Sequence, residues 1–275
     1  MKKNKIKLII LAILGLGFLY FNVVYINPNV LTIRQETLVT SKMPDNKNLT
    51  LVYFSDIQYD KDKPNTAFND LAETVNAFDA DVVIFGGDLF DFDHDNGIDY
   101  ASQDKIISEL SAIECSLGKY AVLGDQDHTN QETIKNILTA SKFEVLTNHV
   151  TTIYDGPKAL INLVALEPQM YQTMDVNELY SGLNEDIYTI SVCHTPDTFS
   201  EVEHGDYMLS GHTMNGQLYI PFFSQFFDLP GGNEYYRHKY QKDNLTLDIT
   251  SGIGTKNQNI RFLADPEIVV YQIHQ

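Results

Sequence analysis

Residues 81–91 read DVVIFGGDLFD, and this stretch decides the fold. Asp81–Phe85 is a short apolar run rich in β-branched residues, which is typical of a buried strand. Gly86 and Gly87 stop the run, and Asp88 follows directly. An acid at the end of a buried strand is placed where open α/β sheets collect their ligands. The stretch therefore predicts an α/β sheet with a polar site at its edge.

Strands and helices alternate on both sides of this stretch. Thr66–Phe78 has helical spacing, with Phe68, Leu71, Val75 and Phe78 on one face. Strand–helix–strand alternation predicts a parallel sheet with right-handed crossovers. The other predicted strands of this half are Leu49–Ser55 and Tyr120–Leu123, and the other helices are Lys105–Ile113 and Glu132–Leu138.

The pattern changes after Val150, where strands follow one another with less helix between them. One short helix is expected at Pro196–Val202. The chain has no repeat, linker or low-complexity segment, so we expect one domain with two β-rich halves. The predicted strands are Thr151–Tyr154, Ala159–Ala165, Ile187–Cys193, Asp206–Leu209, Leu245–Thr250 and Glu267–Ile273.

The first residues predict a membrane segment. Lys2, Lys3, Lys5 and Lys7 precede an apolar run from Leu8 to Ile26 that only Asn22 interrupts. Nineteen helical residues span roughly 28 Å, close to the thickness of a bilayer core. Lysines before the span predict a cytoplasmic N-terminus and an exported remainder. We expect an anchor at residues 1–28 and an extracytoplasmic domain at residues 29–275 in the cell membrane. A cleaved signal peptide is the alternative, although no A-x-A-like site follows.

The charge balance excludes one class of function. The 275 residues carry 37 acidic and 19 basic side chains, a net charge of −18. Proteins that follow a nucleic-acid backbone need a basic stripe, so no nucleic-acid partner is expected. An acidic chain is compatible with cation binding. Two cysteines, Cys115 and Cys193, cannot make a disulfide framework.

Five potential metal ligands fall at the ends of predicted strands. They are Asp56, Asp88, Asp125, His194 and His212. Carboxylates that converge at one sheet edge repel one another unless a cation lies among them. Carboxylate and imidazole ligands together suit Mn, Fe or Zn. Taken singly, a strand-end Asp is more often a helix N-cap than a metal ligand, and a single His is more often structural or solvated. The metal hypothesis depends on all five occurring together.

The order of these residues resembles the calcineurin-like metallophosphoesterase family. The family blocks are D-x-H, G-D-x-x-D, G-N-H-D, an isolated His and G-H-x-H. The matching segments here are Asp56-Ile57-Gln58, Gly87-Asp88-Leu89-Phe90-Asp91, Gly124-Asp125-Gln126-Asp127, Cys193-His194-Thr195-Pro196-Asp197 and Gly211-His212-Thr213-Met214. The tail segments Ser251–Thr255, Arg261-Phe262 and Pro266-Glu267-Ile268 make the chain most similar to the membrane-anchored bacterial branch that includes lipid A precursor pyrophosphatases.

The resemblance implies a four-layer α/β/β/α sandwich with a two-metal centre that hydrolyses phosphodiesters or pyrophosphates. In such a centre, two ions activate a hydroxide for attack on phosphorus. By position, Asp88 is implied to bridge both ions. Asp125, His194 and His212 are implied to complete one metal site, and Asp56 is implied to serve the other.

Four motif positions depart from the family pattern. Gln58 and Met214 stand where the family has His, and both changes fall on the metal site that Asp56 serves. Amide and thioether groups are weak ligands for such ions, so this site is predicted to be degraded. Asp125 replaces an Asn, which adds negative charge to the other site. Gln126 replaces the His that assists the leaving group.

Two hypotheses follow from these changes. The first is an active hydrolase with one or two divalent ions and Gln126, Asp127 and His128 as catalytic candidates, His128 standing in for the missing His. The acidic segment from Asp91 to Asp95 is a candidate for a replacement ligand. For this segment and for His128, an ordinary solvated loop is the alternative explanation. The second hypothesis is a pseudoenzyme that acts as an exported binding or regulatory module.

The expected substrate is a lipid-linked or envelope phosphoester, by analogy with the related branch. The segment Pro221–Phe227 contains four Phe residues and could contact a membrane or an acyl chain. An ordinary packing loop is the alternative.

Overall fold

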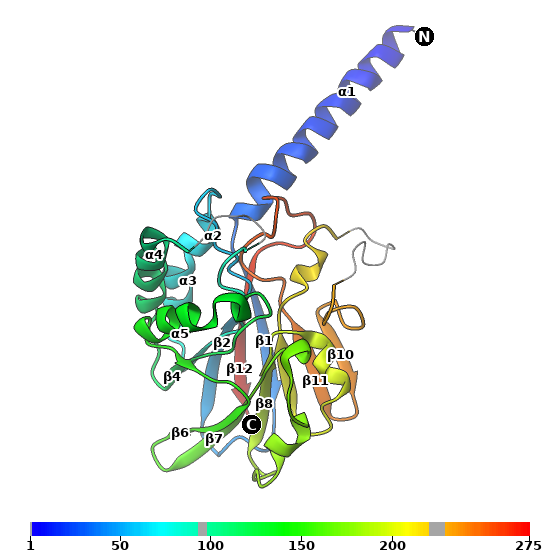
Figure 1. Cartoon of the computed structure of the whole chain (residues 1–275). Coiled ribbons are helices and arrows are strands. Elements are labelled where there is room, and N and C mark those ends of the chain that lie inside the picture. Colours follow the sequence, from blue (N-terminus) through cyan, green and yellow to red (C-terminus); the bar gives the residue numbers. More distant parts are fainter. Residues whose placement is uncertain (1, 93–97, 220–228) are drawn as a thin grey trace.

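The computed structural model describes residues 2–92, 98–219 and 229–275 and contains two six-stranded sheets, helices packed beside them and one projecting N-terminal helix (Figure 1). The first sheet has the order β1-β12-β2-β3-β4-β5. β2, β3, β4 and β5 run parallel, and β12 lies antiparallel to β2. Its strands are β1 (Thr32–Val39), β2 (Asn48–Phe54), β3 (Val82–Phe85), β4 (Gly118–Ala121), β5 (Glu144–Val145) and β12 (Glu267–His274).

The second sheet has the order β10-β11-β9-β8-β7-β6. Its four central strands are parallel, and the edge strands β6 and β10 are antiparallel to their neighbours. The two sheets are mainly parallel, as the strand–helix alternation predicted for the first half; the antiparallel pairs β12–β2, β6–β7 and β10–β11 were not predicted. The strands are β6 (His149–Asp155), β7 (Lys158–Leu166), β8 (Tyr188–Cys193), β9 (Tyr207–Ser210), β10 (Lys239–Lys242) and β11 (Leu245–Ile249).

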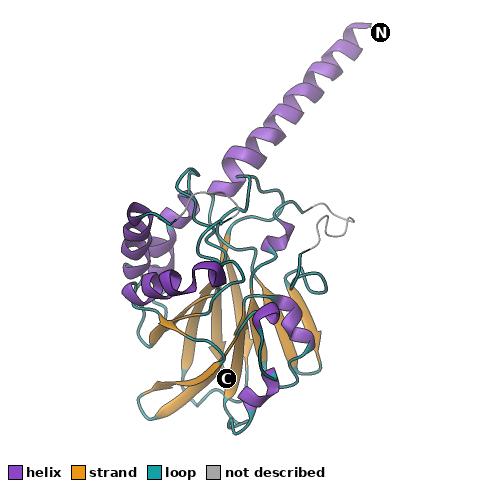
Figure 2. Cartoon of the chain, viewed as in Figure 1, coloured by secondary structure: helices purple, strands orange, loops and turns teal. Residues whose placement is uncertain are grey.

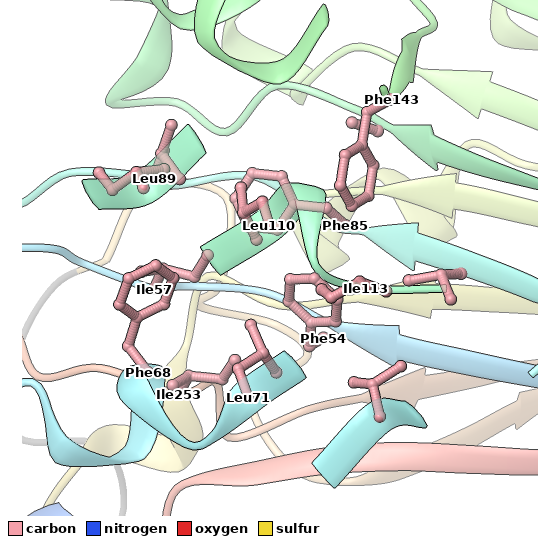
Figure 3. Close-up of a cluster of buried hydrophobic side chains, with 14 of the residues drawn as sticks. Phe54, Ile57, Phe68, Leu71, Phe85, Leu89, Leu110, Ile113, Phe143 and Ile253 are labelled. Atoms are coloured by element: carbon pink, nitrogen blue, oxygen red, sulfur yellow. The ribbon is translucent and has the colours of Figure 1, made fainter. Parts of the chain in front are cut away.

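Three buried apolar layers hold these elements together. One lies between the first sheet and its helices, where Phe54 and Phe85 of the strands meet Leu71 and Leu110 of the helices (Figure 3). Another fills the space between the two sheets, with Tyr53, Ile84 and Leu163 among its members. The third covers the outer face of the second sheet. These helices are α2 (Thr66–Asn69), α3 (Leu71–Asn76), α4 (Tyr100–Ser111) and α5 (Gln131–Ala140).

The four-layer α/β/β/α architecture is confirmed, with one layer thinner than expected. The outer face of the second sheet is covered by short 3₁₀ helices, η5 (Val176–Tyr180) and η6 (Pro196–Ser200). The helix predicted at Pro196–Val202 is thus a 3₁₀ turn. Figure 2 shows that the longer helices gather beside the first sheet and that loops gather at the end from which α1 projects.

Several element boundaries differ from the sequence prediction for local reasons. The helix expected at 66–78 is divided at Asp70, and the carboxylate of Glu109 on α4 accepts the N–H of Ala72 at 3.1 Å at the start of α3. α4 begins five residues earlier than predicted because Asp99 caps it, accepting the N–H of Ser102 at 2.7 Å. The sequence did not predict β1, β5 or β10.

The N-terminal segment forms α1 (Lys2–Phe21), a π-helical turn η1 (Asn22–Ile26) and a 3₁₀ turn η2 (Asn27–Asn29). Within the described residues, one helix is long and apolar enough to cross a membrane, and none of it is buried. A signal sequence has the same length and composition, so the helix by itself fits an anchor and a signal peptide equally.

Candidate metal centre

The candidate site lies where strands of both sheets end. His194 follows β8 directly, and His212 comes two residues after β9. Asp56 and Asp88 follow β2 and β3 of the facing sheet. Because parallel strands bring their carboxyl ends to one edge, the two sheets deliver these side chains to a common end of the molecule.

Apolar neighbours fix the acidic residues in place. Ile57 and Leu89, the residues directly after Asp56 and Asp88, are fully buried and belong to the same apolar core cluster as Ile253 (Figure 3). Each acid is therefore attached to a residue that cannot leave the core without exposing apolar surface. Burial of these neighbours thus ties both acids to the core of the first sheet.

Glycines allow the loops to approach one another closely. A Cβ atom at Gly124 would lie 2.1 Å from Oδ1 of Asp88, and one at Gly87 would lie 2.3 Å from the amide nitrogen of Gly124. Any other residue at these two positions would separate the loops that carry Asp88 and Asp125. Gly87 and Gly124 are thus needed for the close approach of the two loops, and Gly87 also for its left-handed backbone.

The site also contains an unusual number of residues with left-handed backbones. Asp56, Gln58, Asp88, His212 and Met214 all have φ between +46° and +67°. Such conformations are uncommon outside glycine and cluster at functional sites, where the surrounding fold enforces them.

Four side chains form a compact group of possible ligands: Asp88, Asp125, His194 and His212, whose donor atoms lie within 4.8 Å of one another. Nε2 of His194 lies 3.3 Å from Oδ1 of Asp125 and 3.4 Å from Oδ2 of Asp88. Nδ1 of His212 lies 2.8 Å from the same Asp125 oxygen. This is the set that the resemblance implied for one metal site.

The ring orientations of the two histidines fit a cation. Nδ1 of His194 lies 2.7 Å from the carbonyl of Gly86, and Nε2 of His212 lies 3.0 Å from the carbonyl of Pro230. Carbonyl oxygens only accept, so these nitrogens carry the protons. The lone pair of the other nitrogen in each ring then faces carboxylates. This pattern, with the far ring N–H held by a carbonyl, is typical of metal-ligating histidines.

Asp56 lies next to this group. It is fully buried, and its Oδ2 accepts hydrogen bonds from the backbone N–H of His212, at 3.0 Å, and from the hydroxyl of Ser55. Its Oδ1 has no hydrogen-bond partner among the described residues and lies 3.9 Å from Nε2 of His194. A buried carboxylate oxygen without a donor favours a cation nearby.

The charges of the group are strongly coupled. Burial tends to lower the pKa of His194, but Asp88, Asp56 and Asp125 outweigh it and raise that pKa well above its usual value. For Asp125 burial acts to raise the pKa, and hydrogen bonds from His194 and His212 lower it well below its usual range. Burial raises the pKa of Asp56. In the metal-free chain, a proton on His194 therefore offsets part of the negative charge of the carboxylates.

Two glutamine amides converge on Asp88. Nε2 of Gln58 and Nε2 of Gln126 each lie 2.8 Å from its Oδ2. The amide of Gln126 also lies 3.2 Å from Oε1 of Gln58. Met214, the other changed motif position, is buried in the turn η7 (Met214–Gly216).

Asp127 and His128 have different surroundings from each other. The carboxylate of Asp127 is fully buried and accepts the backbone N–H groups of Asp88, Leu89 and Gly124 at 2.8–2.9 Å.

His128 stacks on Tyr171, with ring centroids 3.8 Å apart. The hydroxyl of Tyr171 donates to the carbonyl of Asp125 at 3.3 Å. Tyr171 was not predicted as a site residue; it lies in the 3₁₀ turn η4 (Gln169–Tyr171) of the other half of the chain.

Two predicted segments extend beyond the described residues. Asp91 is described and buried, and its carboxylate pairs with Lys63 at 2.6 Å. Asp93, His94 and Asp95, the other candidates for a replacement ligand, lie outside the described residues, as does the aromatic segment Pro221–Phe227.

Comparisons of sequence identify the relatives of the chain. It is 27% identical over 256 residues to the uncharacterized metallophosphoesterase YkuE of Bacillus subtilis, covering 90% of this chain and 87% of the relative. It is 24% identical to the metallophosphoesterase YkoQ of the same organism, over 84% of this chain and 86% of the relative. A Campylobacter jejuni metallophosphoesterase is 25% identical over 82% of this chain and 59% of the relative. No family model matches the chain.

These relatives confirm the family resemblance: the homologues of the chain are metallophosphoesterases. None of the three is named for a lipid A precursor, so the resemblance to that branch stays a prediction. Solved structures similar to the chain include GAP50 of Plasmodium, described as the anchor in the inner membrane complex, with a TM-score of 0.46, 13% identity and 82% of this chain and 81% of that chain covered. The 5'-nucleotidase of Candida albicans has a TM-score of 0.39, 10% identity and 74% and 45% coverage.

Proposed function

We propose that the chain is a membrane-anchored, metal-dependent phosphoesterase with one divalent ion held by Asp88, Asp125, His194 and His212. The orientation of the two histidines carries the proposal. Each ring has one N–H fixed by a backbone carbonyl and turns its other nitrogen toward Asp125. Nitrogen and oxygen donors in this arrangement fit Mn, Fe or Zn.

The ion, when bound, supplies a Lewis acid for a phosphoryl oxygen and lowers the pKa of water. The protein supplies the position of its ligands. Asp127 acts as a positioning residue, since its carboxylate holds the backbone of Asp88 and Gly124 together. Asp125 contributes a full negative charge where the family has an amide, which tightens cation binding and makes the ion a weaker Lewis acid.

The second metal site of the family is proposed to be degraded in this chain. Two amide N–H groups, from Gln58 and Gln126, are directed at Oδ2 of Asp88, the residue that the resemblance implies would serve both ions. These donors satisfy the carboxylate without metal. Asp56 accepts from the backbone N–H of His212 and the hydroxyl of Ser55 through Oδ2. Its Oδ1, which has no donor among the described residues, lies 3.9 Å from Nε2 of His194, beside the ligands of the one proposed ion.

His128 is proposed to assist the leaving group in place of the missing family histidine. Burial lowers the pKa of its imidazole. It lies flat against Tyr171, whose hydroxyl contacts the carbonyl of Asp125. This stack places the imidazole beside the loop that carries Asp125 and keeps it there.

The proposed location is the extracytoplasmic face of the cell membrane, with residues 1–28 as a single-pass anchor and residues 29–275 as the phosphoesterase domain. The lysines before the helix support this orientation. A tethered site acts on substrates within reach of the envelope, so the proposed substrate is a lipid-linked or envelope phosphoester.

Hydrolysis of a generic phosphodiester by the full chain in detergent, with Mn, Zn, Fe or Mg added in turn, tests the proposal. We expect slow turnover that His194→Ala abolishes and His149→Ala, at an exposed position on β6, leaves unchanged. A pseudoenzyme is the competing function, favoured by the two amides on Asp88. Absence of activity with every metal, together with its appearance in the Gln58→His, Gln126→His and Met214→His triple variant, would establish the pseudoenzyme.

A further inference from the structure

We propose that the apolar surface at the base of the N-terminal helix, formed by Tyr25, Ile26, Val30 and Leu263, contacts the lipid bilayer and holds the metal-ligand end of the sheets against it. We call this the anchor-base surface. The inference rests on the proposed retention of the helix in the membrane, and it is independent of catalysis.

The helix joins the domain through fixed contacts. The backbone N–H of Arg261 donates to the carbonyl of Val23 at 3.0 Å, and the side-chain amide of Asn27 donates to the carbonyl of Arg261 at 3.2 Å. Pro28, the next residue, is buried. The last turn of the apolar segment is therefore part of the folded domain, and its direction sets the direction of the domain.

Arg261 connects this junction to the candidate metal centre. Its guanidinium is fully buried and donates to the carbonyls of Ser251 at 2.7 Å and of Gly254. The N–H of Gly254 in turn donates to the carbonyl of Asp56 at 2.7 Å. One buried side chain thus joins the base of the helix to the loop that carries Asp56.

A shared cavity confirms how close the two regions are. Pro28 lines a small cavity together with Ile57, the residue after Asp56, and Gly254. In Figure 1 the segment at 250–265 lies at the foot of α1, at the same end of the sheets. The metal ligands therefore lie at the end of the domain nearest the membrane that would hold the helix.

Leu263 is the residue that most requires a partner on this surface. Its backbone is left-handed, with φ of +51°, and its side chain is 53% exposed. A branched apolar side chain in this conformation is strained, and its exposure to water adds a hydrophobic cost. Tyr25, Ile26 and Val30 are 57%, 41% and 50% exposed beside the same junction.

The bilayer is the occupant that fits this position. The anchor-base surface continues the exposed apolar surface of α1, so a membrane that surrounds the helix reaches it first. Aromatic and aliphatic side chains next to a spanning helix are typical of the interface region.

Tryptophan fluorescence tests the surface directly, because the chain contains no Trp. Three single-Trp variants of the full chain are reconstituted in phosphatidylcholine vesicles with and without brominated acyl chains, which quench nearby indoles. Leu263→Trp reports the anchor-base surface and Phe18→Trp reports the helix. Val39→Trp reports the opposite end of the domain, where Val39 is 70% exposed at the end of β1.

We expect brominated lipid to remove most of the emission of Leu263→Trp and Phe18→Trp and to leave that of Val39→Trp unchanged. Quenching of Phe18→Trp alone would overturn this inference and leave the anchor intact. Loss of quenching at Phe18→Trp would overturn the anchor itself and this surface with it. Quenching at Val39→Trp equal to that at Leu263→Trp would overturn the orientation. Unfolding curves of the three variants in detergent confirm that each is folded.

Discussion

Gln58 donates its side-chain amide to Oδ2 of Asp88 across 2.8 Å, and both residues hold left-handed backbones to do so. Gln126 donates to the same oxygen at the same distance. An amide carries no net charge, so these two donors satisfy the Asp88 oxygen by hydrogen bonding without neutralising its charge. In the proposed single-ion centre, the cation held with Asp125, His194 and His212 supplies that neutralisation.

This relationship predicts the metal content of the chain. Protein purified without chelators should contain about one divalent transition ion per chain, and Gln58→His together with Met214→His should raise the number to two, because imidazoles replace two weak ligands. Elemental analysis measures both values. Gln241→His, at an exposed position on β10, is the matched control and should stay at one ion. Two ions in the unchanged chain would contradict the single-ion proposal.

Metal removal should lower stability. An ion that binds only the folded state stabilises it by about 2.7 kcal/mol when its concentration is one hundred times its dissociation constant. A chelator should therefore lower the melting temperature of the chain, and His194→Ala should already melt low and respond little to the chelator. His149→Ala should respond as the unchanged chain does. Equal chelator responses in all three proteins would rule out the assigned ligands.

Asp127 should stabilise the loops that carry Asp88 and Gly124 rather than take part in the chemical step. Its two oxygens accept three backbone N–H groups. Asn has only one acceptor oxygen, and its side-chain amide would face a backbone N–H that now donates to the other carboxylate oxygen. We expect Asp127→Asn to cost about 2–4 kcal/mol in the free energy of unfolding and to weaken metal binding.

Urea unfolding and metal titration measure the two effects of Asp127→Asn. Asp186→Asn, at an exposed turn, is the control and should change neither. A variant with normal stability and metal affinity but no turnover would assign Asp127 to the chemical step instead.

The sequence predicted the five strand-end ligand candidates because apolar runs end abruptly at each of them, and strand ends of parallel sheets meet. It did not predict Tyr171, since the contact with His128 joins segments from opposite halves of the chain and leaves no spacing to read. From the sequence, Arg261 is recognisable only as part of a tail motif. Its role depends on full burial among backbone carbonyls, which no local pattern encodes.

The division of the helix predicted at 66–78 has a similar cause. Phe68, Leu71 and Val75 are buried as their spacing indicated. The break at Asp70 is accompanied by a contact from Glu109 on another helix. Tertiary contacts of this kind override helical spacing, which is why element types were predicted more successfully than their boundaries.

Lys119 should make stability depend on pH. It is buried, with its ammonium 2.8 Å from the carbonyl of Leu110, and burial lowers its pKa to about 8. Between this value and the ordinary pKa of lysine, the unfolded chain binds more protons than the folded chain. The free energy of unfolding should therefore rise with pH across that window, and the cost of the buried charge should be fully present below pH 8.

Lys119→Met should remove this contribution and flatten the profile, as measured by urea unfolding from pH 7 to pH 10. Lys158→Met, at an exposed position on β7, should keep the slope of the unchanged chain. A slope that survives in Lys119→Met would show that another group is responsible.

Leu263 should be a position where stability and membrane contact oppose each other. Asn tolerates the left-handed backbone that strains Leu, so Leu263→Asn should raise the free energy of unfolding in detergent by about 1 kcal/mol. The same change removes apolar surface from the anchor base, so protection of the 259–264 backbone from hydrogen exchange in vesicles should fall. Val30→Asn is the matched control: it is equally exposed but has an ordinary φ of −109°, so it should weaken the membrane contact without stabilising the fold. Stabilisation of both variants would mean that removing exposed apolar surface, rather than relieving backbone strain, explains the gain.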